Sequence, residues 1–219
     1  MTRFDDSTLT SETLAPLPGS SSGRGRVLII ACGALAREIL ALRDLNGWSH
    51  MDLTCLPAIL HNHPEKIAAA AQEAIDKHRG DYGQIFMAYA DCGTGGALQA
   101  VCDAAGVEMI AGPHCYSFFT GNEAFEAAGE VTSFFLTDFL ARQFDTFVVK
   151  PLGLDRHPEL AEMYFGNYEK LIYLAQTDDP ALTAKAEAAA EALGLAFELR
   201  MTGYGDLAAA LETLNGAAG

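Results

Sequence analysis

The sequence predicts an α/β protein whose mainly parallel sheet is covered by helices on both faces, in three layers. Short apolar runs rich in β-branched residues, such as residues 27–31 and 84–90, alternate with longer segments that carry apolar residues at helical spacing. Hydrophobic residues make up 50% of the chain, and its 21 glycines include several that separate these segments. Because alternating strands and helices favour parallel sheets, the expected architecture is Rossmann-like.

Residues 26–150 are expected to form the first part of the domain, with four strands that each lead into a helix. Gly33 permits the tight turn after the first strand, and Pro64 suits the first turn of the second helix. Residues 1–25 are polar and without periodicity, so they are expected to be an N-terminal arm that is disordered or only loosely docked. The strands are predicted at residues 27–31, 51–56, 84–90 and 107–112.

Residues 151–219 continue the alternation as a βαβα part. Strands are predicted at residues 170–176 and 195–201, and the second of two strong helices closes the chain. This part forms either a second small lobe or additional strands on one sheet. Residues 133–149 are mixed in character and are expected to form a helix with a short edge strand.

The charge of the chain excludes several classes of function. With 14 basic and 29 acidic residues, the net charge of −15 disfavours binding to nucleic acid or to anionic membrane surfaces. No apolar run approaches the ~18 residues that span a bilayer, and the N-terminus lacks the apolar region of a secretory signal. We therefore expect a cytoplasmic protein that acts on a small molecule or through a protein partner.

Four of the five cysteines fall where a predicted strand ends, namely Cys32, Cys55, Cys92 and Cys115. The carboxyl ends of parallel strands meet at one edge of a sheet, which is where ligands bind in open α/β folds. These four thiols are therefore expected to share one rim. Cys102 lies instead on the apolar face of a predicted helix, as a buried core cysteine does.

The cysteines and nearby histidines suggest a metal site. Thiolate and imidazole ligands suit zinc or an iron–sulfur cluster, and an odd number of cysteines in a chain of this size argues against a disulfide framework. The expected ligands are Cys32, Cys92 and Cys115 with His61 as the fourth, because the loop that carries His61 can fold back over the rim. Cys55 is the alternative to His61. Burial of these cysteines in the core is the competing interpretation, since no CxxC pair is present.

Two other functions stay open. Cys92 precedes a glycine-rich stretch at a helix N-terminus, where the helix dipole stabilises a thiolate, so it is a candidate nucleophile with His61 or His114 as base. Asp91 is then a catalytic acid, a carboxylate that hydrogen-bonds to and orients a histidine, or merely a carboxylate at the start of the helix. The third possibility is a module that binds a small ligand without catalysis.

Several of these motifs resemble an uncharacterised family, domain of unknown function 1638. The resemblance covers residues 26–205 and rests on a Cys-Gly after the first strand, a Leu-Pro-X-X-Leu-His-X-X-Pro stretch, a Tyr-X-X-Cys-Gly turn and a Cys before an aromatic run. It implies a site and, loosely, a role in redox, cofactor or one-carbon metabolism, with methyl transfer and a corrinoid partner protein. Matched position by position, it marks Cys32, Leu56, Pro57, His61, Pro64, Cys92 and Cys115.

Overall fold

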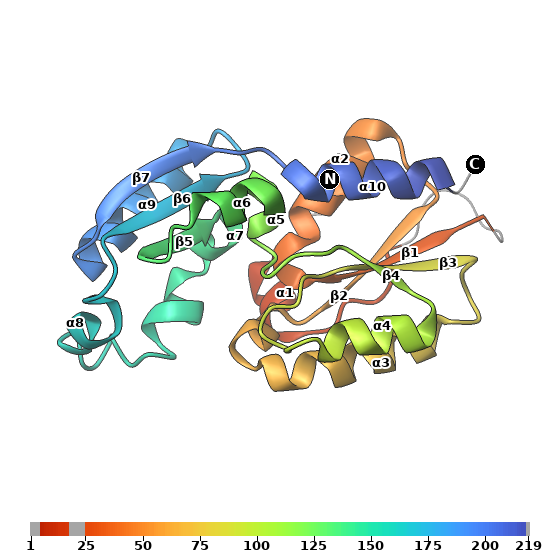
Figure 1. Ribbon diagram of the computed structural model, residues 1–219, viewed down its shortest axis with the longest axis horizontal. Coiled ribbons are helices and arrows are strands. Elements are labelled where there is room, and N and C mark those ends of the chain that lie inside the picture. Colours follow the sequence, from red (N-terminus) through yellow and green to blue (C-terminus); the bar gives the residue numbers. More distant parts are fainter. Residues whose placement is uncertain (1–4, 18–24, 218–219) are drawn as a thin grey trace. The chain divides into compact units, whose positions relative to one another are not determined.

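The computed structural model describes residues 5–17 and 25–217, which form two compact units (Figure 1). The first unit comprises Met1–Phe118 and Asp206–Gly219, and the second is Phe119–Gly205. The division therefore differs from the boundary expected at residue 150. The last helix returns to the first unit because its apolar side chains, Leu207, Leu211 and Leu214, are buried there.

The sheet of the first unit has four parallel strands in the order β2-β1-β3-β4. The chain leaves the central strand β1 toward one side to form β2 and then crosses to the other side to form β3. This order places a topological switch point between β1 and β3, where open α/β sheets form a crevice. The strands are β1 Val27–Cys32, β2 Met51–Leu56, β3 Gln84–Ala88 and β4 Glu108–Met109.

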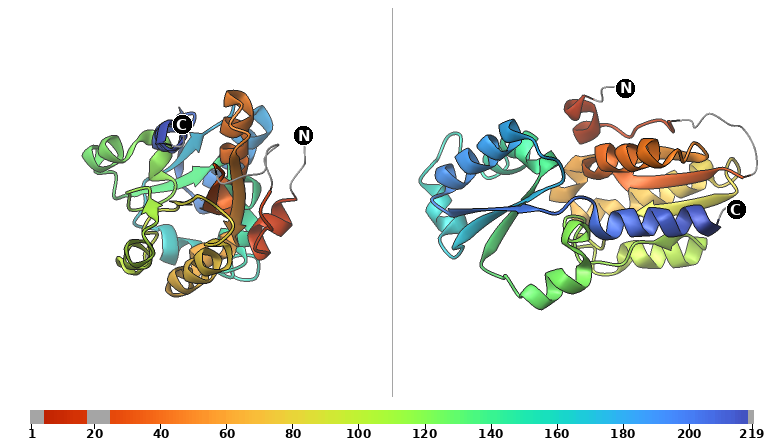
Figure 2. Two further views of the ribbon diagram at one scale, coloured as in Figure 1. Left: turned by 90° about the vertical axis from the view of Figure 1, so that its right-hand side faces the viewer. Right: turned by 90° about the horizontal axis from the view of Figure 1, so that it is seen from above.

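Helices cover both faces of this sheet, so the predicted three-layer Rossmann-like architecture is confirmed. Helices α3 and α4 lie on one face, and α2 and α10 lie on the other (Figures 1 and 2). In α2 the side chains of Ile39 and Leu42 are buried, and the helix ends at Gly47 in the left-handed conformation that favours glycine. The four helices are α2 Ala36–Asn46, α3 Ile67–His78, α4 Ala97–Ala105 and α10 Gly205–Ala217.

The expected disorder of the N-terminal arm is wrong for residues 5–17. Helix α1 spans Asp6–Ser11, is capped by Asp5 and buries the side chain of Leu9 completely. Its Asp6 carboxylate accepts two hydrogen bonds from Arg37, at 3.0 and 2.6 Å. The remainder of the arm, residues 1–4 and 18–24, lies outside the described residues. A single buried leucine in a polar stretch gave no periodic pattern, so the sequence did not reveal the helix.

The segment after α1 lies along the outer edge of β2. The Leu14 amide donates to the Cys55 carbonyl at 3.0 Å, and Leu17 forms an antiparallel bridge with Leu53. At the carboxyl end of β1, the Leu9 carbonyl oxygen is so close to Gly33 that a Cβ there would collide with it. A glycine at position 33 therefore lets α1 pack against the turn that follows Cys32.

The second unit contains a separate parallel sheet in the order β5-β6-β7. The predicted βαβα part thus adds no strand to the sheet of the first unit. Residues 133–137 form the first strand of the second sheet. Helix α9 begins at Pro180 after the Asp179 cap and ends at Gly194. The strands are β5 Ser133–Thr137, β6 Lys170–Ala175 and β7 Ala196–Met201. The helical segments are α6 Asn122–Ala128, α7 Asp138–Arg142, the π-helical turn η4 Asp145–Val149, α8 Leu160–Phe165 and α9 Pro180–Leu193, and the short helix α5 Ser117–Thr120 spans the boundary between the units.

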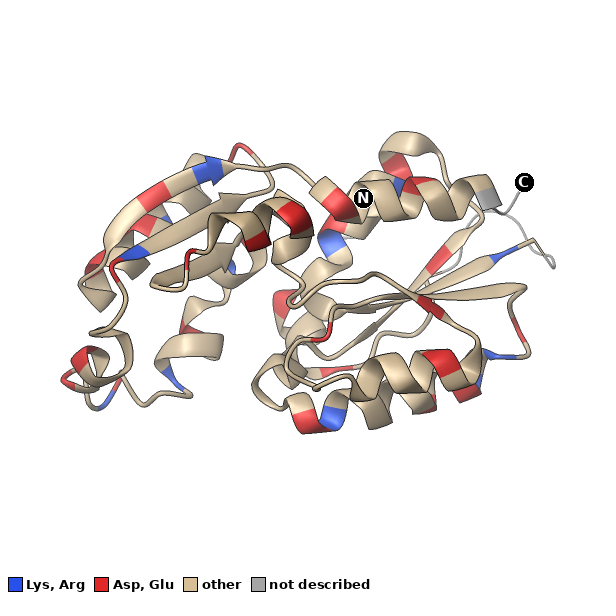
Figure 3. Ribbon diagram, in the orientation of Figure 1, with Lys and Arg blue, Asp and Glu red and all other residues tan. Residues whose placement is uncertain are grey.

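The distribution of charge and the length of the helices bear on two expectations from the sequence, an acidic surface and the absence of a membrane span. Acidic residues are spread over both units and outnumber lysine and arginine (Figure 3). Among residues 5–17 and 25–217, none of the helices has both the length and the apolar character needed to cross a membrane.

Candidate thiol site

Three elements deliver cysteines to the switch point of the first sheet. Cys32 is the last residue of β1, Cys92 follows β3 after four residues, and Cys115 lies in the loop that follows β4. The residue after Cys32 starts a short 3-10 turn, η1 Gly33–Leu35, that leads directly into α2. All three cysteines therefore lie beyond the carboxyl ends of strands, the position at which open α/β sheets bind ligands.

The three thiols contact one another in a row with Cys115 in the middle. The sulfur of Cys115 lies 3.3 Å from that of Cys92, and its thiol also hydrogen-bonds to the Cys32 sulfur. Cys32 is 4% exposed, whereas Cys92 and Cys115 are partly exposed. The structure thus brings together the three cysteines expected to be ligands, and one end of the row is open to solvent.

Two backbone hydrogen bonds tie the loops that carry Cys92 and Cys115. The Asp91 amide donates to the Gly112 carbonyl at 3.0 Å, and the Cys92 amide donates to the Pro113 carbonyl at 2.9 Å. These bonds continue the pairing of β3 with β4 beyond the end of the sheet. The backbone therefore keeps the two loops, and with them Cys92 and Cys115, side by side.

The turn at Cys92 has an unusual backbone. Among the described residues, Cys92 is the one non-glycine residue with a positive φ, 47°, and Gly93 follows with a φ of 82°. Side chains other than glycine, asparagine and aspartate rarely adopt this conformation, and it costs roughly 1–2 kcal/mol. Strain of this kind concentrates at functional sites, so the conformation of Cys92 is a reason to look for chemistry there.

Asp91 holds this turn in place. Its carboxylate accepts hydrogen bonds from the Gly96 amide at 2.7 Å, the Thr94 hydroxyl at 2.8 Å and the Gly95 amide at 3.2 Å. The Gly96 amide is the main reason why the pKa of Asp91 is below its ordinary value. Of the roles considered from the sequence, the geometry supports the carboxylate that caps the glycine-rich turn.

Cys32 and Cys115 shift each other's pKa in opposite directions. The hydrogen bond from Cys115 is the main cause that lowers the pKa of Cys32, opposed by burial and supported by the Ala34 amide at the start of the helical segment. The pKa of Cys115 is raised well above its ordinary value, because its thiol proton is held by Cys32 and Cys92.

Tyr89 is a member of the site that the sequence analysis missed. It is 1% exposed, and its hydroxyl interacts with the Cys32 sulfur, which helps to lower the pKa of Cys32. Burial, and then the charges of Cys32, Cys115 and Cys92, raise the pKa of Tyr89 well above its ordinary value. The Tyr-X-X-Cys-Gly motif contains this tyrosine. In the β1–β3 register Tyr89 follows Ala88, the partner of Ala31, so it lies level with Cys32 and on the same face of the sheet.

His61 and His114 lie near each other beside this site. The first belongs to the 3-10 turn η2 Ala58–Asn62, and burial by surrounding protein atoms, followed by the charge of His114, lowers its pKa. Desolvation also lowers the pKa of His114, whose ring stacks on Tyr116 at 4.9 Å between centroids. The short turn η3 Pro64–Lys66 follows, and a Cβ placed on Gly93 would touch Pro64, so this loop reaches the Cys92 turn.

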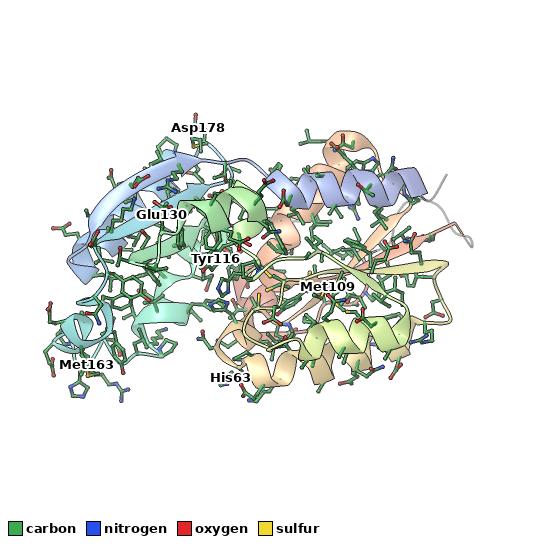
Figure 4. All side chains as sticks on the ribbon, in the orientation of Figure 1. His63, Met109, Tyr116, Glu130, Met163 and Asp178 are labelled. Carbon is green, nitrogen blue, oxygen red and sulfur yellow. The ribbon has the colours of Figure 1, made fainter. Side chains whose placement is uncertain are left out.

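The other candidates lie away from the row of thiols. Cys55 pairs with Ala31 in the β1–β2 register, so its side chain belongs to the opposite face of the sheet from that of Cys32. Burial raises its pKa well above the ordinary value. His63 lies at the periphery of the first unit and faces Glu65 at 3.6 Å (Figure 4). Cys102 is fully buried in α4, as expected.

The thiol and imidazole side chains at this site are the types that bind a soft metal, but they do not surround a common point in the structure. Within the described ranges, no three His, Cys, Asp or Glu side chains surround a common point as a complete metal-binding group. Two thiolates on one tetrahedral zinc ion lie about 3.8 Å apart, since each bond is about 2.3 Å long. The 3.3 Å between the Cys92 and Cys115 sulfurs is near that value, so this pair of thiols is spaced almost as two ligands of one zinc ion are.

A protein-family model described as "Protein of unknown function (DUF1638)" matches residues 55–211, well over half of the chain. The chain belongs to this family. The resemblance noted from the sequence motifs is thereby confirmed, and the matched region of the family includes His61, Tyr89, Cys92 and Cys115. Cys32 lies before the matched residues. No curated protein and no solved structure gave a significant match.

Proposed function

We propose that Cys32, Cys92 and Cys115 form a thiolate site for a soft metal, either zinc or iron, the latter alone or within an iron–sulfur cluster. The observation that carries this proposal is the convergence of the three cysteines, which come from three different strand ends. Soft sulfur ligands select these metals. Cys115, which touches both other thiols, is the central ligand of the set.

His61 is the proposed fourth ligand, and His114 is its nearest competitor. Both rings lie on loops that reach the Cys92 turn, and the lowered pKa of each keeps the imidazole neutral, the form that binds metal. The buried position of Cys32 favours a ligand over a nucleophile, because a substrate in solution cannot reach a side chain that is 4% exposed. The register of Cys55 with Ala31 places its side chain on the opposite face of the sheet from Cys32, so we do not include Cys55 in the proposed ligand set.

The proposed site favours one class of function. When bound, a metal held by three thiolates and one exchangeable position supplies Lewis acidity or electron transfer to a small molecule. Free thiols of this kind persist in a reducing compartment, which supports a cytoplasmic location. The family resemblance adds redox, cofactor or one-carbon metabolism, with a corrinoid protein as a partner to test.

Metal analysis of anaerobically purified protein tests the proposal. We expect about one zinc, or iron with sulfide and a visible absorption band, per chain. Replacing the central ligand, Cys115→Ala, removes the metal, whereas Cys102→Ala is the matched control and retains it. Wild-type protein without metal after reconstitution, or full metal content in the Cys115→Ala protein, contradicts the proposal.

A second candidate function is supported by the strained backbone of Cys92. A partly exposed thiol with a φ of 47°, held on a turn by Asp91, suits a nucleophile that works without metal. In that case the protein is colourless and metal-free, and iodoacetamide modifies Cys92 faster than the four other cysteines. If Cys92 reacts no faster than Cys102, this second function is wrong.

A further inference from the structure

We propose that Cys92 and Cys115 form a reversible dithiol–disulfide couple that reacts with low-molecular-weight disulfides. Forming this disulfide also releases the metal, because it removes two of the three proposed ligands; this consequence rests on the proposed function. The disulfide couple itself stands on separate observations of geometry and access.

The two sulfurs are already close to bonding distance. Their separation is 3.3 Å, and a disulfide bond is about 2.05 Å long, so about 1.3 Å must be closed. The amide of Cys92 is held by the Pro113 carbonyl at 2.9 Å, two residues before Cys115, which keeps the two backbones adjacent. No large rearrangement of the chain is needed to bring the thiols together.

The turn of Cys92 has the freedom to make that short movement. Gly93, Gly95 and Gly96 all follow Cys92 with positive φ values of 82°, 62° and 87°. Apart from the Pro64 contact of Gly93, a Cβ at these glycines would meet nothing within 4 Å, so the turn has open space around it. This space leaves room for the Cys92 side chain to rotate toward Cys115 while Asp91 holds the turn and the sheet stays fixed.

Access separates this pair from the other cysteines. Cys92 and Cys115 are both partly exposed, whereas Cys32, Cys55 and Cys102 are buried. A disulfide reagent can therefore reach one member of the pair and cannot reach Cys32. Although Cys32 also contacts Cys115, it is the last residue of a buried strand and has no glycine-rich turn to move on.

The reaction proceeds by two thiol–disulfide exchanges. The Cys92 sulfur attacks one sulfur of glutathione disulfide, forms a mixed disulfide and releases one glutathione. The Cys115 sulfur then attacks the Cys92 sulfur and releases the second glutathione. The two protons lost by the protein thiols are taken up by the two departing thiolates, so the protein is oxidised by two electrons and glutathione disulfide is reduced.

The test uses the full chain, freed of metal by a chelator and titrated with defined ratios of glutathione to glutathione disulfide. Intact mass spectrometry is expected to show the loss of two hydrogens, about 2 Da, and dithiothreitol restores the original mass. Peptide mapping after alkylation is expected to show Cys92 linked to Cys115, with the other three cysteines alkylated only after denaturation. A link between Cys32 and Cys115, or a stable glutathione adduct without any link, overturns the inference.

Three variants separate this inference from the proposed function. Cys32→Ala is expected to lose metal and keep the disulfide, Cys92→Ala to lose both, and Cys102→Ala to keep both. A wild-type protein that forms the disulfide but never holds metal refutes the metal site and leaves the couple intact. A protein that holds metal but gives no disulfide in its metal-free form refutes the couple alone.

Discussion

The two units place polar side chains at equivalent positions and use them in opposite ways. Both contain a parallel sheet, and in both the residues just beyond the strands gather at the carboxyl edge. In the second unit Asp138, which directly follows β5, is 1% exposed and accepts hydrogen bonds from Tyr173 at 2.7 Å, Gln176 at 3.1 Å and Thr177 at 2.5 Å. Its own amide donates to the Gln176 side chain at 2.8 Å.

The edge of the first unit is built from reactive groups instead. Its three thiols contact one another, the buried Tyr89 hydroxyl interacts with Cys32, and Cys92 has a strained backbone. Buried polar groups in a purely structural network pair as they do around Asp138, without backbone strain. The comparison teaches that a place at the carboxyl edge does not identify a site, whereas contacting thiols on a strained backbone do.

Two cysteines in adjacent strands test the first half of this comparison. We expect Cys32→Ala to weaken zinc binding by more than about 100-fold, which exceeds what changes outside the ligand shell cost. Cys55→Ala, in the neighbouring strand but on the opposite face of the sheet, is expected to leave zinc binding unchanged. Competition with a chromogenic chelator measures both affinities. Equal losses in the two variants contradict the assignment of faces.

Asp138 tests the other part of this comparison, namely that the polar network at the edge of the second unit serves stability. Asp138→Ala removes a buried carboxylate with three side-chain or amide donors, so it is expected to lower the free energy of unfolding by about 3 kcal/mol. Asp178→Ala, at an exposed position of the same unit (Figure 4), is the control and should change it by less than about 0.5 kcal/mol. Urea denaturation followed by circular dichroism measures the difference. Metal content should be the same in both variants, and a loss of metal with Asp138→Ala argues against separate roles.

The strands of the first sheet could be predicted from the sequence because each is a short apolar run with a break after it. Cys32, Cys92 and Cys115 could be placed at one edge for the same reason, since the carboxyl ends of parallel strands converge. The side chain of Cys55 could not be placed in the same way. The end of a strand tells which edge of the sheet a residue lies at, but only the register between β1 and β2 tells which face its side chain points to. Tyr89 belongs to an apolar run, in which a tyrosine is normally a core residue.

Other parts of the fold depend on contacts that no local pattern records. Helix α1 is held by one buried side chain, Leu9, and by the ion pair of Asp6 with Arg37, both of which need the rest of the unit. The return of α10 to the first unit likewise depends on tertiary packing of its leucines. The role of Asp91 as the cap of the Cys92 turn was among the alternatives, and only the hydrogen bonds to Thr94 and Gly96 distinguish it.

A pair of buried tyrosines compares the two edges directly. Tyr173 is completely buried and donates to Asp138, so Tyr173→Phe leaves a buried carboxylate with one donor fewer and should cost about 1.5 kcal/mol of unfolding free energy. Tyr89→Phe removes a hydroxyl whose partner is the Cys32 sulfur, a weak hydrogen-bonding group, so we expect a smaller change, within about 0.5 kcal/mol. Chemical denaturation of metal-free protein measures both. A larger cost for Tyr89→Phe than for Tyr173→Phe reverses the comparison.

The smallest effect concerns a partly buried ion cluster on the sheet of the second unit. Glu130 receives two hydrogen bonds from Arg200, at 2.6 and 2.7 Å, and one from Lys170 at 2.9 Å, and is 19% exposed. The Arg200 guanidinium is the main cause that lowers the pKa of Glu130 from its ordinary 4.5 to about 2. Since the folded-state pKa is depressed, the cluster stabilises the fold above pH 4.5, and this contribution is lost as the pH falls toward 2.

Replacing this carboxylate therefore changes how stability depends on pH. Glu130→Gln is expected to lower the free energy of unfolding by about 1 kcal/mol at pH 7, because partial exposure screens the charges. The difference from wild type should shrink as the pH falls from 5 to 3, since protonated Glu130 resembles glutamine, and thermal unfolding across that range measures it. A difference that stays constant with pH means that the cluster acts through packing rather than charge.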